Sequence, residues 1–312
     1  MHVLGKLSDE HKGYGLVFLA GILWGSIGVF VKIMADAGAS AELTSFLRLA
    51  SATLILLPLC IAKFGLKGLL IDRKTLVVSV FLGVFCLGCC SVLYCLAIEH
   101  VGVGISAVLM NSAPVFTFLF SLAIFKEQPH IFKVAAIMLC VVGCTLAATN
   151  GELSLASLSL VGIIAGIGAG FCYGLTSVVG KLGIGNSNPY CMTMYSTLFA
   201  TLLLSFWIQP WQGMSGLNET ILIAGLLFGL IPTVMAYLVY YRGVDKIKEN
   251  SKIPVIASVE TVVALFLGVA LFGETIGALS WLGIGLVLIS ILLMNVKFKH
   301  MSANEAVVQT VN

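Results

Sequence analysis

The chain contains ten apolar stretches, each about as long as a lipid bilayer is thick. They lie at residues 13–34, 41–62, 75–98, 102–125, 129–149, 158–181, 190–208, 219–241, 253–272 and 276–296. A transmembrane α-helix needs about 20 apolar residues to cross roughly 30 Å of hydrocarbon. Hydrophobic residues make up 59% of the 312 residues and charged residues only 10%, whereas soluble domains have about 25% charged residues. The sequence therefore predicts an integral membrane protein.

The fold class follows from the pattern within these stretches. Only helices and closed barrels satisfy every backbone hydrogen bond in lipid, and barrel strands alternate polar and apolar residues. The ten stretches show no such alternation. We therefore predict an all-α membrane protein of ten transmembrane helices, with residues 1–12 and 297–312 as tails.

The distribution of lysine and arginine predicts the orientation. With the N-terminus placed inside the cell, fifteen of the seventeen basic residues lie in inside segments, and the outside loops contain none. The other two, Lys32 and Arg48, lie within the first two spans. By the positive-inside rule, both termini are predicted to be cytoplasmic and the protein to lie in the inner membrane. The net charge of +3 is then an orientation signal, and we expect no nucleic-acid partner.

The second five spans repeat the first five. Similar residues recur at a nearly constant separation of 146 to 149 positions. The matched pairs are Trp24 and Tyr173, Gly25 and Gly174, Lys32 and Lys181, Tyr94 and Tyr240, and Glu127 and Glu274. Five is an odd number, so the second repeat (156–296) enters the membrane from the opposite side to the first (13–149). Inverted repeats are typical of secondary transporters, whose substrate site lies near the bilayer midplane.

Several short motifs resemble those of a known family. They are Leu23-Trp24-Gly25-Ser26 with Lys32, Phe46-Leu47-Arg48-Leu49, Ser112-Ala113-Pro114-Val115-Phe116 with Lys126-Glu127, Ser258-Val259-Glu260-Thr261-Val262, and Phe272-Gly273-Glu274-Thr275. In order and spacing they resemble the drug/metabolite transporter superfamily, specifically ten-helix transporters built from two EamA-type domains. The resemblance implies export of small metabolites, often amino acids or their relatives. One departure is Thr261, where the family often has proline after the glutamate.

Two charged residues lie deep in predicted spans, where a charge costs at least ~2.5–3.5 kcal/mol. Glu260 is either a protonatable coupling site and partner for a substrate amine, or a structural group bonded to another helix. Arg48 either binds a substrate carboxylate in a bidentate manner, pairs with Glu260, or extends outward. For Lys32, extension toward the outer rim is favoured.

Polar rings and an amide at mid-depth are further candidates for substrate binding: Trp24, Tyr94, Asn111, Tyr173 and Tyr237. A cavity lined by rings and a few polar groups suits a small organic substrate, although each residue alone also fits simple packing. Pro114 and Pro232 lie inside spans, where proline removes a backbone hydrogen bond, and are candidate hinges. Glycines every fourth residue from Gly162 to Gly174 predict close helix packing.

The remaining patterns disfavour other classes of protein. The sequence has no phosphate-binding loop of Walker type and no His-Glu-x-x-His metal motif, and its nine cysteines all lie in predicted spans as small apolar residues. We expect no enzyme activity, metal or cofactor. The favoured function is a secondary transporter of small metabolites working by alternating access, coupled to a proton or an exchanged substrate. Its site is expected between spans 1, 3, 4 and their mates 6, 8, 9, flanked by span 2. The alternatives are a multidrug or cation efflux pump and an uptake carrier.

Overall fold

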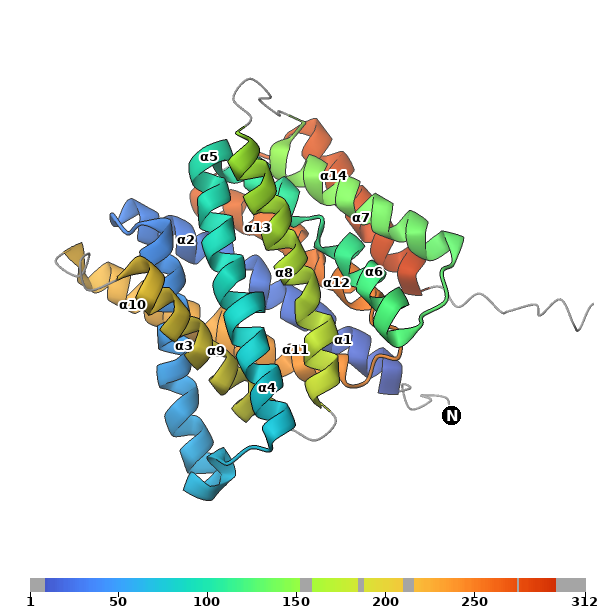
Figure 1. The fold of residues 1–312 in the computed structure, drawn as a ribbon. Coiled ribbons are helices and arrows are strands. Elements are labelled where there is room, and N and C mark those ends of the chain that lie inside the picture. The colour runs from blue at the N-terminus through green and yellow to red at the C-terminus, as the bar shows by residue number, and fades with distance from the viewer. Residues whose placement is uncertain (1–8, 152–158, 185–187, 210–215, 274, 296–312) are drawn as a thin grey trace, which may run out of the picture.

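The computed structural model describes residues 9–151, 159–184, 188–209, 216–273 and 275–295, and its regular structure in these ranges is entirely helical (Figure 1). Within these ranges, nine helices are long and apolar enough to cross a membrane, and a shorter apolar helix, Ala278–Met294, follows them. These segments match the ten predicted stretches in order. The prediction of an all-α, multi-span protein is confirmed. Glu274, predicted to be the mate of Glu127, lies outside the described residues.

Several spans consist of more than one helical segment. The first half contains α1 (Asp9–Gly25), α2 (Ile27–Asp36), α3 (Ala41–Phe64), η1 (Leu66–Leu69), α4 (Arg73–Phe81), η2 (Leu82–Cys89), α5 (Cys90–Met110), α6 (Ala113–Phe125) and α7 (Ile131–Thr149). The second half contains α8 (Leu160–Ile184), α9 (Pro189–Ile208), α10 (Glu219–Gly229), η5 (Leu230–Met235), α11 (Ala236–Val244), α12 (Lys252–Ala257), α13 (Val259–Phe272) and α14 (Ala278–Asn295). The third and fourth candidate spans divide between Val101 and Ile105, within α5.

Polar residues set where many of these helices begin. The side chains of Ser40, Asp72, Asn188 and Asn218 each accept a hydrogen bond from a backbone N–H in the first turn of the following helix. Such caps satisfy backbone donors that a helix leaves unpaired. The spans are therefore bounded by local capping as well as by their apolar length.

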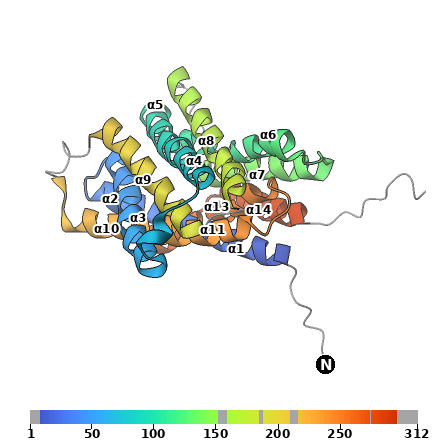
Figure 2. The ribbon, with the colours of Figure 1, turned by 60° about the horizontal axis from the view of Figure 1, so that its bottom comes forward.

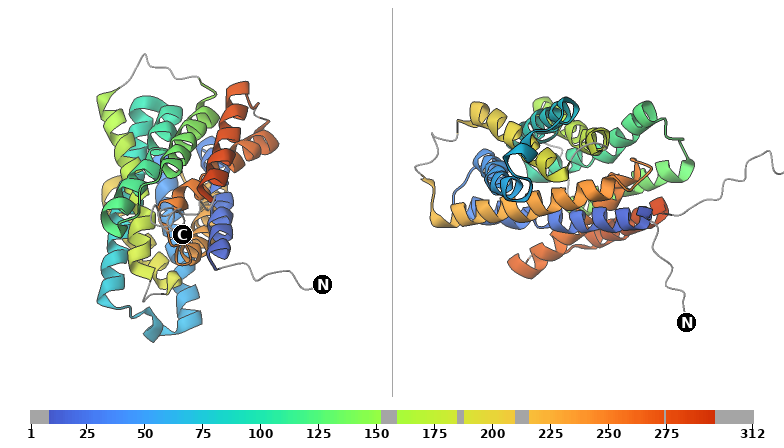
Figure 3. Two further views of the ribbon diagram at one scale, coloured as in Figure 1. Left: turned by 90° about the vertical axis from the view of Figure 1, so that its right-hand side faces the viewer. Right: turned by 90° about the horizontal axis from the view of Figure 1, so that it is seen from below.

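The two halves of the chain are packed into one another. The first span, α1, packs against α11, α12 and α13 of the second half, whereas α8 packs against η2, α5 and α6 of the first. Figure 3 shows α1, in blue, running beside the orange α10–α11 span. The last helices of the two halves, α7 and α14, lie side by side (Figure 2). Each half thus supplies its first span to the other half.

Glycines permit this exchange of helices. A Cβ added at Gly21 of α1 would lie 2.7 Å from the carbonyl oxygen of Ala257. In α8, a Cβ added at Gly174 would lie 2.8 Å from the carbonyl oxygen of Ala113. Real Cβ atoms do not approach a backbone so closely, so these contacts require glycine. The glycine ridge predicted from the sequence is therefore a packing surface between the halves.

Three spans are interrupted at a serine. Ser26 separates α1 from α2, Ser112 precedes α6, and Ser258 separates α12 from α13. Each serine hydroxyl donates to the carbonyl oxygen three residues earlier, at 2.6 to 2.7 Å. This local bond competes with the regular helical pattern. Pro114 lies in the first turn of α6, directly after one break, where proline is well tolerated. The ninth span is broken at Ser258 even though no proline follows Glu260.

The third and eighth spans each contain a π-helical segment, η2 and η5. Pro232 lies in η5, and the adjacent Thr233 hydroxyl donates to the carbonyl oxygen of Phe228 five residues earlier, at 3.2 Å. Cys86 lies 146 positions before Pro232, in η2. Pro232 is predictable from the sequence as an irregular position, whereas η2 is not, because that segment has no proline. Irregular turns of this kind are frequent at functional sites.

Candidate functional site

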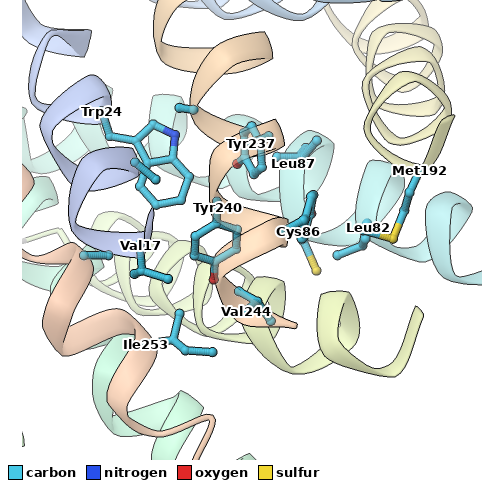
Figure 4. Packing of buried hydrophobic residues seen from close by; sticks show 14 of the residues in the cluster. Val17, Trp24, Leu82, Cys86, Leu87, Met192, Tyr237, Tyr240, Val244 and Ile253 are labelled. Carbon is cyan, nitrogen blue, oxygen red and sulfur yellow. The ribbon is translucent and has the colours of Figure 1, made fainter. Parts of the chain in front are cut away.

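An aromatic cluster lies where α1, α8 and α11 meet. The Trp24 ring centroid is 6.5 Å from that of Tyr173, 5.4 Å from that of Tyr237 and 5.0 Å from that of Tyr240. Figure 4 shows Trp24 facing Tyr237 and Tyr240 across the boundary between the two halves of the chain. Trp24 is only 5% exposed. Two of the predicted site residues, Trp24 and its mate Tyr173, are therefore in contact.

A small cavity lies next to this cluster, at the two breaks that precede α6 and α13. Four of the residues that line it were predicted from the sequence: Asn111, Pro114, Tyr173 and Glu260. The cavity has a volume of about 20 Å³, enough for about one water molecule. The backbone interruptions at Ser112 and Ser258 thus bring an amide, a phenol and a carboxyl group together at membrane depth.

Tyrosines surround the Glu260 carboxyl group. Tyr173 lines the same cavity as Glu260, and Tyr94, Tyr237 and Tyr240 lie within electrostatic reach of the carboxyl group. Among the residues that the structure describes, Glu260 forms no ion pair. Phenol hydroxyls can donate to a carboxylate or accept from a protonated carboxyl group. The surroundings of Glu260 are therefore compatible with either protonation state.

Arg48 lies on α3, near the Tyr237 member of the aromatic cluster. Its guanidinium carbon is 5.5 Å from the Phe228 ring centroid, a cation–π distance. Its Nε is buried without a hydrogen-bond partner in the described part of the chain, and Arg48 forms no ion pair with Glu260 there. Tyr237 lies within electrostatic reach of both Arg48 and Glu260. The predicted alternative of an Arg48–Glu260 pair is thus absent from these residues.

A second cavity, of about 60 Å³, lies between α3, α5 and α9. Glu42, Glu99 and Trp207 contribute to its lining, but none of the predicted site residues does. It is the larger of the two, yet it lies away from the interrupted helices and the deep carboxyl group. We therefore assign the candidate functional site to the smaller cavity and its aromatic neighbours.

The two lysines predicted to be repeat mates make matching contacts at opposite ends of the bundle. The Lys32 Nζ lies 4.3 Å from the Phe272 ring centroid, and the Lys181 Nζ lies 5.2 Å from the Phe125 ring centroid. Lys181 also donates to the backbone carbonyl oxygen of Ile247, at 2.8 Å. Both lysines therefore connect the first span of one half to the fourth span of the other. Lys181 therefore also contributes to packing between the halves, in addition to its role as an orientation charge.

A polar network that the sequence does not predict lies at the end of the bundle where α1 begins. We call it the polar latch; it consists of Glu127, Asn250 and Ser251. The Glu127 carboxylate accepts from the backbone N–H of Asn250 and from the backbone N–H and hydroxyl of Ser251. The Asn250 amide donates to Ser121 at 3.3 Å and Ser177 at 3.2 Å. The latch joins the end of α6 to the loop before α12, and thus one half to the other.

Ion pairs surround the polar latch. The Lys133 Nζ lies 3.7 Å from Glu127 and 3.3 Å from Glu249. Burial would raise the pKa of Glu249, but the positive charges of Lys252 and Lys133 outweigh it and hold this pKa below its usual value. The sequence signal for the latch was the Lys126-Glu127 motif, but its partners lie more than 120 positions away.

The bundle of apolar helices and the interrupted spans around the half-buried carboxyl group of Glu260 define a multi-pass membrane transport protein. A model of the EamA-like transporter family matches the chain twice, at residues 11–149 and 160–296. The chain belongs to this family, and the predicted relationship to EamA-type transporters is confirmed. It is a protein of the inner membrane.

Relatives over nearly the whole chain are also transporters by name. The uncharacterized transporter YwfM of Bacillus subtilis is 22% identical, and the match covers 93% of this chain and 96% of YwfM. An uncharacterized transporter of Archaeoglobus fulgidus is 26% identical over 90% of this chain and 95% of its own. The uncharacterized inner membrane transporter YedA of Escherichia coli is 25% identical over 90% of each chain. One crystal structure, 14% identical, shares the fold with a TM-score of 0.75 over 91% of this chain and 97% of its own.

Proposed function

We propose that this protein is a secondary active transporter that exports small zwitterionic metabolites, amino acids or their close relatives, by alternating access. Its two halves act as inverted five-helix repeats, and both termini lie in the cytoplasm. The observation that carries the proposal is the pair of breaks at Ser112 and Ser258 beside the half-buried carboxyl group of Glu260. Discontinuous helices at the interface of two repeats form the substrate sites of many secondary transporters.

The small size of the cavity supports a mechanism in which the two halves of the protein open around the site. Sites for small organic ligands enclose about 300–1,000 Å³, far more than the 20 Å³ beside Glu260. A metabolite therefore reaches Glu260 only when the halves separate on one side. In the proposed mechanism, one half rocks against the other, so that one mouth opens while the other stays closed.

The two deep charges support a zwitterionic substrate. Arg48 and Glu260 carry opposite charges, and neither forms an ion pair within the described ranges. A substrate with an ammonium and a carboxylate group supplies the missing partner of each. The rings of Trp24, Tyr173 and Tyr237 lie near these charges and provide apolar and cation–π surface. Release of the substrate leaves Glu260 to take up a proton or to receive an exchanged substrate, which couples the two half-cycles.

A second candidate is efflux of organic cations. One deep carboxyl group, that of Glu260, among several aromatic rings is also a suitable environment for a cation. This alternative gives Arg48 no substrate contact, so the two candidates differ in the effect of removing that residue. An uptake carrier for the same metabolites would differ from the exporter only in direction.

Counterflow into proteoliposomes tests the proposal. The purified protein is assayed with labelled amino acids, purine derivatives and quaternary cations at two pH values. We expect one class of zwitterion to enter, with Arg48→Ala lowering uptake about 10- to 100-fold, the range expected for losing a hydrogen bond to a charged group. Glu260→Gln is expected to remove the pH dependence. Arg73→Ala and Glu219→Gln, at exposed positions, serve as matched controls.

The other outcomes are equally informative. Uptake of several unrelated cations that requires Glu260 but not Arg48 would place efflux of cations first. The absence of uptake of any labelled compound by a folded preparation would contradict the transport mechanism.

A further inference from the structure

Two cations meet on one tyrosine at the membrane edge where α3 ends, α9 begins and α11 ends. Arg242 donates to the Tyr190 hydroxyl at 3.0 Å, and its guanidinium carbon lies 5.4 Å from the ring centroid. The Lys63 Nζ lies 4.2 Å from the same centroid. Both cationic side chains are exposed. Neither has an acidic partner in the part of the chain that the structure describes.

This arrangement lacks a negative charge of its own. A neutral phenol offers each cation a ring face and one oxygen atom but does not neutralise either. Two positive charges that share one ring repel each other. Two other cations on this end of the bundle, Lys133 and Lys252, do have a carboxylate partner, Glu249. Lys63 and Arg242 therefore present two uncompensated positive charges, side by side, to a negatively charged group from outside the protein.

The position of the pair is fixed by the neighbouring turn. The Tyr195 hydroxyl donates to the carbonyl oxygen of Leu69 at 2.9 Å, and the Cys191 thiol donates to that of Gly68 at 3.4 Å. These bonds attach η1, from the first half of the chain, to α9 in the second half. The site is thus built in advance and does not depend on a loose loop.

The surroundings of the pair are those of a lipid headgroup region. Leu66 is 71% exposed and Leu70 is 83% exposed, at the turn between α3 and α4 at the bottom of Figure 1. Exposed leucines beside basic residues suit the boundary where acyl chains meet headgroups. Phe64 packs against Tyr190 with ring centroids 5.8 Å apart and extends this apolar surface. A ligand here has both a negative group and hydrocarbon.

We propose that Lys63 and Arg242, arranged around Tyr190, bind the phosphate of an anionic lipid headgroup, such as that of phosphatidylglycerol. Basic pockets between transmembrane helices are suited to such headgroups. Lys63 lies on α3 in the first half and Arg242 on α11 in the second. One bound phosphate therefore bridges the halves and stabilises the arrangement in which α3 and α11 meet at Tyr190. The positive-inside rule accounts for the sign of these charges but not for their convergence on one ring.

Thermal unfolding of the full chain in a neutral detergent tests this proposal without a transport assay. Phosphatidylglycerol, phosphatidylcholine or inorganic phosphate is added to the wild type, to the double variant Lys63→Gln with Arg242→Gln, and to a control, Lys246→Gln with Lys248→Gln. The control removes the same charge from exposed positions on the same side of the bundle. At about 1 kcal/mol for each basic residue, the double variant is expected to bind phosphatidylglycerol about 30-fold more weakly. The control is expected to respond as the wild type does.

Three outcomes would overturn the proposal. The first is an equal response of the double variant and the control. The second is stabilisation by phosphatidylcholine that equals that by phosphatidylglycerol. The third is that inorganic phosphate reproduces the whole effect, which would assign the site to a free anion. The charge-conserving variant Lys63→Arg with Arg242→Lys is expected to retain binding, and it provides the comparison if the neutral variant folds poorly. Because the readout is lipid binding, its failure is distinct from failure of the proposed transport function.

Discussion

At the scale of single residues, Glu127 and Glu260 have different surroundings. Glu127 receives three hydrogen bonds from Asn250 and Ser251 and lies near Lys133. Glu260 faces tyrosines and forms no ion pair among the described residues. A carboxylate with all its partners stabilises one arrangement of the halves, whereas one without an ion partner is available to a substrate or a proton. The position of Glu260 deep within a predicted span indicated a functional role. No residue near Glu127 in the sequence indicated that its partners are Asn250 and Ser251.

The polar latch leads to a prediction about stability. The Glu127 side chain is 6% exposed, and its substitution by glutamine removes the charge that accepts from two backbone groups and a hydroxyl. We expect Glu127→Gln to lower the free energy of unfolding by about 3 kcal/mol, the lower end of the range for breaking a buried pair. The matched control is Glu249→Gln, at a side chain 39% exposed, with an expected loss below about 1 kcal/mol. Denaturant unfolding in detergent measures both, and equal losses would argue against the latch.

At the scale of elements, apolar length predicted the spans, but it did not predict their interruptions. The breaks at Ser26, Ser112 and Ser258 depend on one hydroxyl each, and serine occurs elsewhere in these spans without breaking a helix. The π-helical segment η2 contains neither proline nor serine. Its counterpart η5 was indicated only through Pro232. Local propensity is too weak to select these sites, because packing against the opposite half determines which backbone irregularities are stabilised.

The π-helical segments give a prediction about hinges. Pro232→Ala restores a backbone N–H in η5 and favours regular helix, which stiffens the eighth span. We expect unchanged or increased thermal stability together with transport about tenfold slower, equivalent to about 1.4 kcal/mol in the barrier. Pro58 of α3 is also inside a helix, but it is exposed, so Pro58→Ala is expected to leave the rate unchanged. Rates in proteoliposomes and unfolding temperatures together decide the matter, and equal rates for both variants would exclude Pro232 as a hinge.

At the scale of the whole molecule, each half exchanges its first span with the other half. Gly21 and Gly174 allow α1 and α8 to approach a foreign backbone closely. The constant spacing of residues in the sequence suggested the two repeats, and the family model matches the chain twice. Which helices pack together across the halves was not predictable from that spacing, because equivalent apolar surfaces in each half compete for the same partner.

The topology of the whole chain can be tested with reporter fusions. We expect a reporter at either terminus to be cytoplasmic, and one inserted between Asp36 and Ala41 to lie outside. The reporter at the C-terminus is the most informative one, because it follows α14, whose apolar stretch is shorter than the other candidate spans. Termini on opposite sides would show that this last helix does not cross the membrane, and the inverted-repeat proposal would then be wrong.

The sequence by itself determined that the protein is a helical membrane protein, where its spans lie and which family it belongs to. These properties depend on apolar length, charge and local motifs, all of which are encoded within short stretches of chain. The tertiary structure alone decided that Trp24 meets Tyr173 and that Glu127 meets Ser251. It also decided that Arg48 and Glu260 form no pair in the described part of the chain. Such contacts join residues more than a hundred positions apart, and they form only when helices from both halves pack together in lipid, where hydrophobicity gives no preference for one helix face over another.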